Sequence, residues 1–94
     1  MTLWHRSNLL AQEALISVNA ILENARKAQD RRRALKYCNE AETALKRIDI
    51  SAVTTDQSAL EQIIVAFREH GRVLETWNQS EKALKSYIKA KELG

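Results

Sequence analysis

Apolar side chains recur with helical spacing along most of the chain. In four stretches they fall three and four residues apart, so that each stretch carries an apolar stripe along one face. Such a stripe is typical of an amphipathic helix that buries one face. We therefore predict helices over residues 3–28, 31–48, 56–77 and 79–93. The positions expected to face inward are Leu3, Leu10, Ala14, Val18, Ile21, Leu22, Ala25, Ala34, Leu35, Cys38, Ala41, Leu45, Ile48, Leu60, Ile63, Ile64, Phe67, Gly71, Leu74, Trp77, Ala83, Leu84, Tyr87 and Ile88.

Short polar residues mark where the later helices begin. Asp30 is a natural N-cap for the second helix, and Asp56 or Ser58 for the third, because their side-chain oxygens accept from free backbone N–H groups. Asn78 is the expected start signal of the fourth helix, since a glutamate follows it at the spacing of a capping box. The first helix begins after Thr2 or Ser7.

The composition favours helices throughout. Proline is absent, only two glycines occur, and Ala, Leu, Lys, Glu, Gln and Arg are abundant, all of them good helix formers. The expected fold is all-α, with one domain over residues 1–94: a helical hairpin at about 3–48, a linker at 49–55, and a second hairpin at about 56–93. Two stacked hairpins of antiparallel helices are expected, and a closed four-helix bundle is the alternative because the same periodicity fits both.

The second hairpin carries a regular alternation of large and small residues. A large residue, a glycine and a second large residue line one helix, and small, aromatic and small residues line the next. Two antiparallel helices pack closely only where small side chains face large ones. The pattern is Phe67, Gly71, Leu74, Ala83, Tyr87 and Ala90.

This pattern resembles the tetratricopeptide repeat (TPR), whose large, Gly, large, Ala, aromatic and Ala positions these six residues occupy. The match covers residues 64–93, with His70 where the family prefers leucine. In the first hairpin only Ala34 and Ala41 fit, and Leu22 replaces the glycine. Three-helix microtubule-interacting-and-transport modules are a less well matched second family. The TPR resemblance implies a non-enzymatic module that holds a partner peptide or helix in a concave groove, and no ligand residues transfer from it.

No set of residues predicts catalysis or metal binding. His5, Cys38 and His70 are the only soft ligand candidates, and no two of them have the spacing of a metal motif. No glycine-rich phosphate loop or nucleophile motif occurs. We therefore expect no enzyme, no cofactor and no metal, with Cys38 and His70 as isolated helix residues.

A basic cluster occurs where the first helix gives way to the second: Arg26, Lys27, Arg31, Arg32, Arg33 and Lys36. Arg31, Arg32 and Arg33 fall in the first turn of a helix, where the dipole disfavours cations. This placement favours an acidic partner such as phosphate, anionic lipid or a Glu/Asp-rich peptide, and a solubilising turn is the simpler explanation. Nucleic acid is disfavoured, because no aromatic residues are interleaved with the basic ones.

Two further features suggest a partner surface. Trp4 precedes the regular stripe, and tryptophan is enriched in binding hot spots. In the fourth helix Leu84 and Ile88 widen the apolar arc beyond what one neighbouring helix needs. These residues favour self-association as a homodimer, or a place at the end of a longer protein.

The expected function is a non-enzymatic protein–protein interaction or scaffold module that binds a protein or peptide. The alternative is a basic adaptor that binds anionic lipid or nucleic acid through the basic cluster. A single cysteine allows no internal disulfide. With no signal-peptide pattern and no apolar run of membrane length, we expect a cytoplasmic, reducing location.

Overall fold

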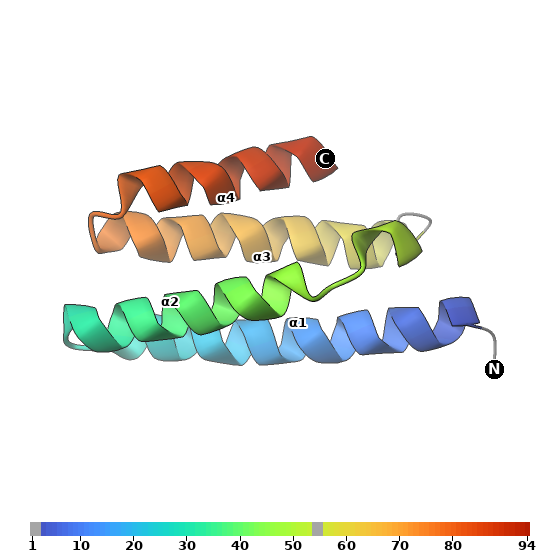
Figure 1. Cartoon of the computed structure of the whole chain (residues 1–94), viewed down its shortest axis with the longest axis horizontal. Helices are drawn as coiled ribbons and strands as arrows, with labels where there is room; N and C mark the ends of the chain where they lie inside the picture. The colour runs from blue at the N-terminus through green and yellow to red at the C-terminus, as the bar shows by residue number, and fades with distance from the viewer. Residues whose placement is uncertain (1–2, 54–55) are drawn as a thin grey trace.

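The computed structural model describes residues 3–53 and 56–94, with side chains from residue 10 onward except at residue 52. The chain folds into four helices, α1 (Leu3–Lys27), α2 (Arg31–Lys46), α3 (Gln57–Thr76) and α4 (Ser80–Leu93). A single 3₁₀ turn, η1 (Ile50–Ala52), precedes α3 (Figure 1). No strand occurs in these described ranges, so the all-α prediction is confirmed.

Aspartate side chains begin two of the helices. Asp30 accepts a hydrogen bond from the Arg33 backbone N–H at 2.8 Å, and Asp56 accepts one from Ala59 at 3.1 Å. Asp56, rather than Ser58, is therefore the N-cap of α3. The expected N-cap at Asn78 is wrong, because Gln79 occupies that position without a side-chain hydrogen bond. Asn78 instead makes the turn after α3 with φ of 61°, a left-handed conformation that asparagine tolerates better than most residues.

The helices form two antiparallel pairs that stack through α3. α1 pairs with α2, α3 pairs with α4, and α3 also packs on both α1 and α2. Among the described residues α4 packs extensively only on α3, so it does not close a four-helix bundle against α1. The result is an elongated stack in which α4 is the outermost helix (Figure 1).

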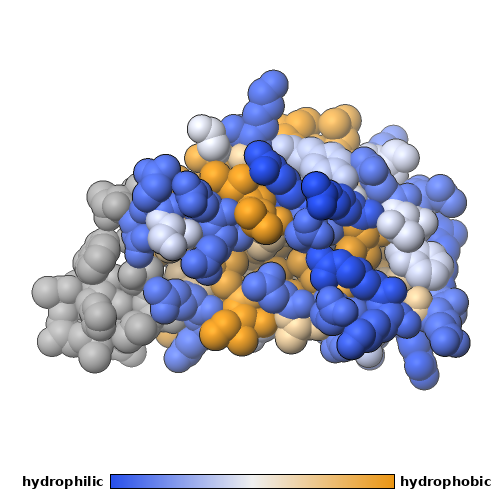
Figure 2. All heavy atoms as spheres, turned by 180° about the vertical axis from the view of Figure 1, so that it is seen from behind, coloured by the Kyte–Doolittle hydropathy of each residue, from blue (hydrophilic) through white to orange (hydrophobic). Residues whose placement is uncertain are grey.

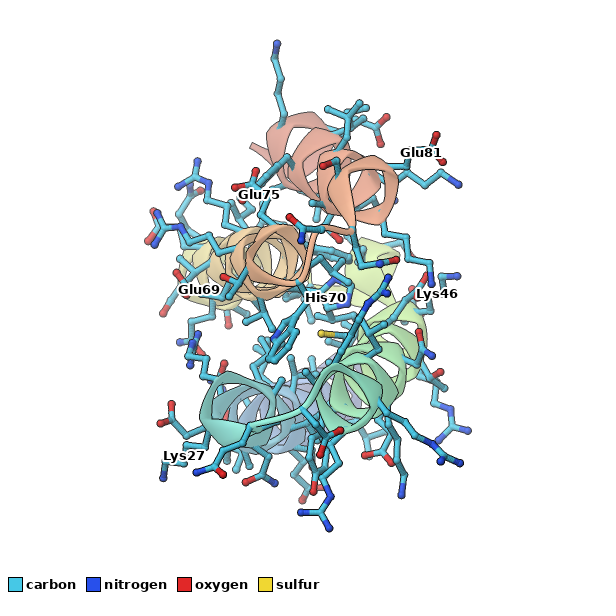
Figure 3. All side chains as sticks on the ribbon, turned by 90° about the vertical axis from the view of Figure 1, so that its left-hand side faces the viewer. Lys27, Lys46, Glu69, His70, Glu75 and Glu81 are labelled. Atoms are coloured by element: carbon cyan, nitrogen blue, oxygen red, sulfur yellow. The ribbon has the colours of Figure 1, made fainter. Side chains whose placement is uncertain are left out.

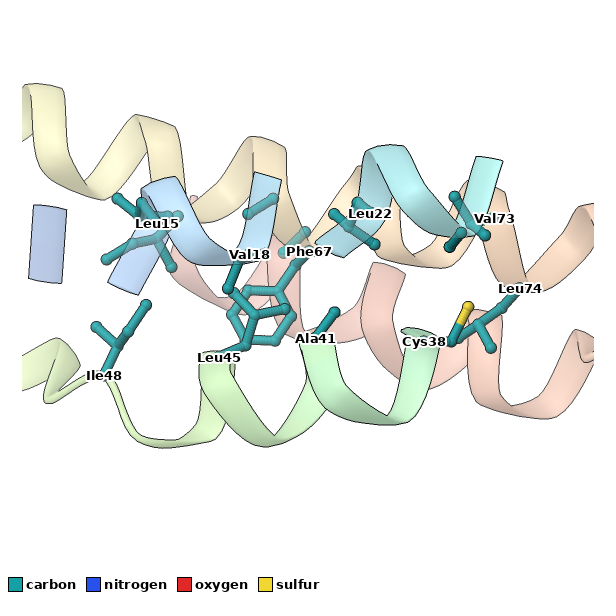
Figure 4. Close-up of a cluster of buried hydrophobic side chains, with 14 of the residues drawn as sticks. Leu15, Val18, Leu22, Cys38, Ala41, Leu45, Ile48, Phe67, Val73 and Leu74 are labelled. Atoms are coloured by element: carbon teal, nitrogen blue, oxygen red, sulfur yellow. The ribbon is translucent and has the colours of Figure 1, made fainter. Parts of the chain in front are cut away.

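The core lies between α1, α2 and α3. Leu15, Val18 and Leu22 of α1 meet Cys38, Ala41 and Leu45 of α2, and Phe67, Val73 and Leu74 extend the cluster from α3 (Figure 4). Each large apolar side chain buried in this way contributes about 1.5–3 kcal/mol.

The predicted inward faces of α1 and α4 need correction. Leu10 is 57% exposed, and its neighbour Ala11 is buried instead. Leu84 and Ile88 are 58% and 47% exposed, because α4 packs mainly on α3 within the described part of the chain and turns Ala83, Ser86 and Ala90 toward the interior.

The segment between the hairpins does more than link them. η1 continues the chain in a tight turn, and Val53 is fully buried in the core. The linker therefore contributes an apolar side chain and fixes the path from α2 to α3.

Candidate functional site

The pattern of large and small residues in the second hairpin lies at the contact between α3 and α4. A Cβ atom placed on Gly71 would lie 2.7 Å from Cε1 of Tyr87, so the glycine leaves the space that the tyrosine ring occupies. Ala83 and Ala90 are buried on the opposing helix, and Phe67 and Leu74 are buried on α3. Gly71 and Tyr87 therefore meet directly between α3 and α4, and the other four residues of the pattern are buried.

Tyr87 lies at the edge of this contact. Its side chain is half-buried, and burial together with the neighbouring Glu75 carboxylate raises the pKa of its hydroxyl. Its ring covers Gly71 while its hydroxyl faces the carboxylates of α3.

His70 joins three helices through a buried polar junction. Its Nδ1 lies 2.7 Å from Ser86 Oγ of α4, and its Nε2 lies 3.0 Å from the Cys38 carbonyl oxygen of α2. The imidazole is 4% exposed and lies between α3 and the α1/α2 pair (Figure 3). The expectation that His70 is an isolated helix residue is therefore wrong.

The hydrogen bonds assign the tautomer of His70. A carbonyl oxygen only accepts, so Nε2 carries the proton and donates to Cys38. In the neutral ring Nδ1 is then the acceptor, and the Ser86 hydroxyl donates to it. Burial lowers the pKa of His70 and Lys82 lowers it further, against the opposing effects of the Cys38 carbonyl and Glu42. The junction is built for neutral histidine.

A groove opens beside this junction, between α2, η1, α3 and α4. Its volume is about 520 Å³. We call it the lysine groove, because four exposed lysines form its rim while buried side chains form its floor. Its lining residues are Glu42, Leu45, Lys46, Ile48, Ile50, Phe67, His70, Lys82, Lys85, Ser86 and Lys89.

The charge on the rim of the lysine groove is mostly unbalanced. Glu42 is its one carboxylate and pairs with Lys46 at 3.0 Å. The hydrogen bond from Lys46 holds the pKa of Glu42 below its usual value. Lys82, Lys85 and Lys89 form no ion pair with any residue that the structure describes. The rim therefore presents three free ammonium groups above an apolar floor.

The basic cluster of the sequence is divided among several roles. Arg26 pairs with Glu23 at 3.0 Å and with Glu69 at 2.8 Å, which ties α1 to α3. Lys27 lies 3.8 Å from Glu23, and Arg33 lies 4.0 Å from Asp30.

The rest of the cluster stays exposed on α2. Arg31, Arg32 and Lys36 are exposed and form no ion pair within the described part of the chain. Arg32 and Lys36 also line a shallow depression on α2, which Arg47 and Glu40 share.

The remaining candidates lie apart from the groove. Leu84 and Ile88 are on α4 but do not line the groove. Trp4 belongs to α1, and its side chain falls outside the described residues. On the face opposite to that of Figure 1, hydrophobic residues are exposed between hydrophilic ones (Figure 2).

The groove residues were only partly recognisable in the sequence. Lys82, Lys85 and Lys89 have spacings of three and four residues, which places them on one helical face, but this spacing alone predicts no more than a solvated face. Lys46 and Ile50 come from other elements, and nothing in their local sequence indicates that they share a groove with α4.

Within the described residues, no group of three or more His, Cys, Asp or Glu side chains is placed to hold a metal ion. In the same part of the chain, every helix is too short or too polar to span a membrane. Comparisons with protein-family models, with curated proteins and with solved structures found no match to this chain.

Proposed function

We propose that this chain is a non-enzymatic protein-interaction module in which two TPR-like hairpins hold a partner segment. The observation that carries the proposal is the lysine groove, whose apolar floor and unpaired cations leave both apolar and polar contacts for a partner to make. Ligand sites in proteins combine these features. The contact between Gly71 and Tyr87 supports the TPR-like assignment, because the small position of α3 lies against the aromatic position of α4.

A selection experiment tests this function without assuming a partner. Panning a random-peptide phage library against the whole chain should enrich peptides of convergent sequence. Hydrogen exchange with and without a selected peptide should then show protection in α4 and in the end of α2. Enriched peptides that fail to bind in solution would contradict the proposal.

A second candidate function is the basic adaptor. Arg31, Arg32 and Lys36 support it, because all three are exposed and none pairs with a described carboxylate. Co-sedimentation with vesicles that contain phosphatidylserine tests it. Reversing charge at Arg31, Arg32 and Arg33 should abolish sedimentation if the adaptor function is correct, and should leave peptide binding unchanged.

Self-association is the remaining part of the proposal. Leu84 and Ile88 lie one helical turn apart and are about half exposed. A stable interface buries roughly 800 Å² on each partner, so two side chains provide an anchor within a dimer rather than a whole interface. Light scattering coupled to size-exclusion chromatography measures the mass, and Leu84→Glu should shift a dimer to monomer.

We place this module in a reducing intracellular compartment. Its single cysteine, Cys38, is buried as a free thiol, and burial raises the pKa of that thiol. A high thiol pKa reduces reactivity, which suits a packing role for Cys38.

A further inference from the structure

We infer that the lysine groove binds an acidic amphipathic helix from a different protein. This inference rests on the proposed interaction function and adds the chemistry of the partner. It is drawn from the spacing of the rim charges, the nature of the floor and the size of the groove.

The rim lysines of α4 follow one another along a helical face, so carboxylates at the same spacing on a partner helix can pair with them. Lys82, Lys85 and Lys89 stand at positions i, i+3 and i+7 of α4, which spans about 10 Å at a rise of 1.5 Å per residue. A partner helix that lies along α4 with carboxylates at the same spacing meets all three. Lys46 of α2 also lines the groove, but its charge is balanced by Glu42.

The floor requires that the partner also be apolar on one face. Leu45, Ile48 and Phe67 are buried there, and Ile50 is half-buried. Lysine side chains bring apolar stems to the same surface while their charges stay in water. Because Leu45, Ile48 and Phe67 are already covered, the apolar surface left for a partner is that of Ile50 and the lysine stems, and an acidic peptide without apolar residues would leave it exposed to water.

The size of the groove shows how such a helix is held. A helix with its side chains is about 10 Å across, wider than a space of about 520 Å³ can enclose along two turns. The partner therefore lies on the rim and inserts the side chains of one face, as amphipathic helices do in other grooves.

A second copy of this chain does not provide that helix. The chain carries a net charge of +3, and none of its acidic residues has another acidic residue three or four positions away. Its helices therefore lack carboxylates on successive turns. Nucleic acid is a poor fit as well, because Phe67 is 9% exposed and offers no open face on which a base can stack.

The test uses a labelled synthetic peptide of roughly 18 residues, a length at which an isolated helix becomes marginally stable. It carries leucine on one face and glutamate beside it at positions i, i+3 and i+7. A charge-swapped peptide, with lysine for glutamate, keeps the apolar face. Fluorescence anisotropy with the full chain, at about 50 mM and about 300 mM salt, measures the affinity of each peptide.

Two triple variants locate the binding site. The groove variant is Lys82→Gln, Lys85→Gln and Lys89→Gln. The control variant is Arg68→Gln, Arg72→Gln and Lys91→Gln, which removes the same charge from exposed residues outside the groove. We expect the groove variant to weaken binding of the acidic peptide by at least about tenfold. The control variant should change it by less than about threefold, and the charge-swapped peptide should not bind.

Three results would overturn the inference. One is equal loss of affinity in the two triple variants. Another is equally tight binding of polyglutamate or single-stranded DNA, which would indicate a general polyanion surface. The third is failure of the acidic peptide to bind while phage-selected peptides of other chemistry bind. That last result would refute the acidic helix and leave the proposed function standing, whereas failure of both kinds of peptide would refute both.

Discussion

Replacing Gly71 with alanine is expected to have opposite effects on stability with and without the Tyr87 ring. In a helix interior, alanine is more favourable than glycine by about 1 kcal/mol. In this chain, however, the new methyl group would lie 2.7 Å from Tyr87 Cε1 and 3.0 Å from Cζ. One of the two groups must move, and overpacking of this kind costs about 1–3 kcal/mol.

The helix propensity of alanine and its clash with the Tyr87 ring act in opposite directions, so each background has its own prediction. In the native chain, Gly71→Ala should lower the free energy of unfolding by about 0–2 kcal/mol, because the steric cost equals or exceeds the helix gain. In a Tyr87→Ala background the ring is gone, and the same substitution should raise that free energy by about 1 kcal/mol. The coupling energy between the two positions is then about 1–3 kcal/mol.

Urea unfolding followed by far-UV circular dichroism measures all four proteins of this cycle. Since Tyr87 is half-buried, we expect Tyr87→Ala to weaken the fold without abolishing it. A coupling energy near zero, with Gly71→Ala stabilising both backgrounds equally, would refute the contact between Gly71 and the tyrosine ring. The slope of the free energy of unfolding against urea concentration should be the same for all four proteins, as a check that each variant unfolds in one step.

Four further predictions concern the buried polar junction of His70, the Asp30 N-cap and the packing of α4. Because burial lowers the pKa of His70, the unfolded chain binds more protons, so the free energy of unfolding should fall as pH drops below about 6.5. Urea titrations between about pH 5 and pH 8 test this, and His5→Gln should keep the effect whereas His70→Gln should lose it. Ser86→Ala should cost about 1–3 kcal/mol, since it leaves Nδ1 of His70 without a donor; the exposed Ser80→Ala is its control, and equal costs would contradict the junction. Asp30→Ala should lower the stability by about 1 kcal/mol and Asp30→Asn by much less, because asparagine also serves as an N-cap. Thermal melts measure both variants, and equal melting temperatures would argue against a cap. Ala83→Leu should lower the free energy of unfolding in urea by about 1–3 kcal/mol. Leu84→Ala, at the exposed neighbouring position, should change it by less than about 0.5 kcal/mol. The reverse order would mean that α4 is rotated about its axis.

The helices and most of their ends were predictable because they depend on neighbouring residues. Asp30 and Asp56 each accept a hydrogen bond from a backbone N–H three residues later. The sequence alone placed the start of α2, and for α3 it left Asp56 and Ser58 as alternatives. The start of α4 was misplaced, because Asn78 is as well suited to a left-handed turn as to an N-cap. Local sequence does not separate these two roles of asparagine.

The orientation of the apolar stripes was harder to predict. Around Leu10, Ala11 and Ala14 the sequence offers apolar residues on more than one face of α1, and packing on α2 and α3 selected Ala11 over Leu10. In α4 the apolar arc includes Leu84 and Ile88, and only the absence of a further helix beside them in the described structure leaves them exposed.

The candidate site depended almost entirely on the tertiary structure. His70 meets residues 16 and 32 positions away, and no periodicity indicates contacts over such separations. The lysines of α4 were visible as a basic face, but Lys46 and the apolar floor come from α2, η1 and α3. The basic residues at positions 26–36 were the predicted partner surface, and Arg26 among them is an ion-pair partner of Glu69.

By itself, the sequence determined that this chain is helical, that α2 begins after Asp30, and that Gly71 and Tyr87 belong to a close-packed hairpin. Those features follow from backbone hydrogen bonding and side-chain periodicity, which act within one or two turns. Only the tertiary structure decided that α4 packs mainly on α3 among the described residues, that His70 is a buried bridge between helices, and that four lysines line one groove. Those features arise where segments distant in the chain meet, because burial and charge at such a contact depend on all of the helices that form it.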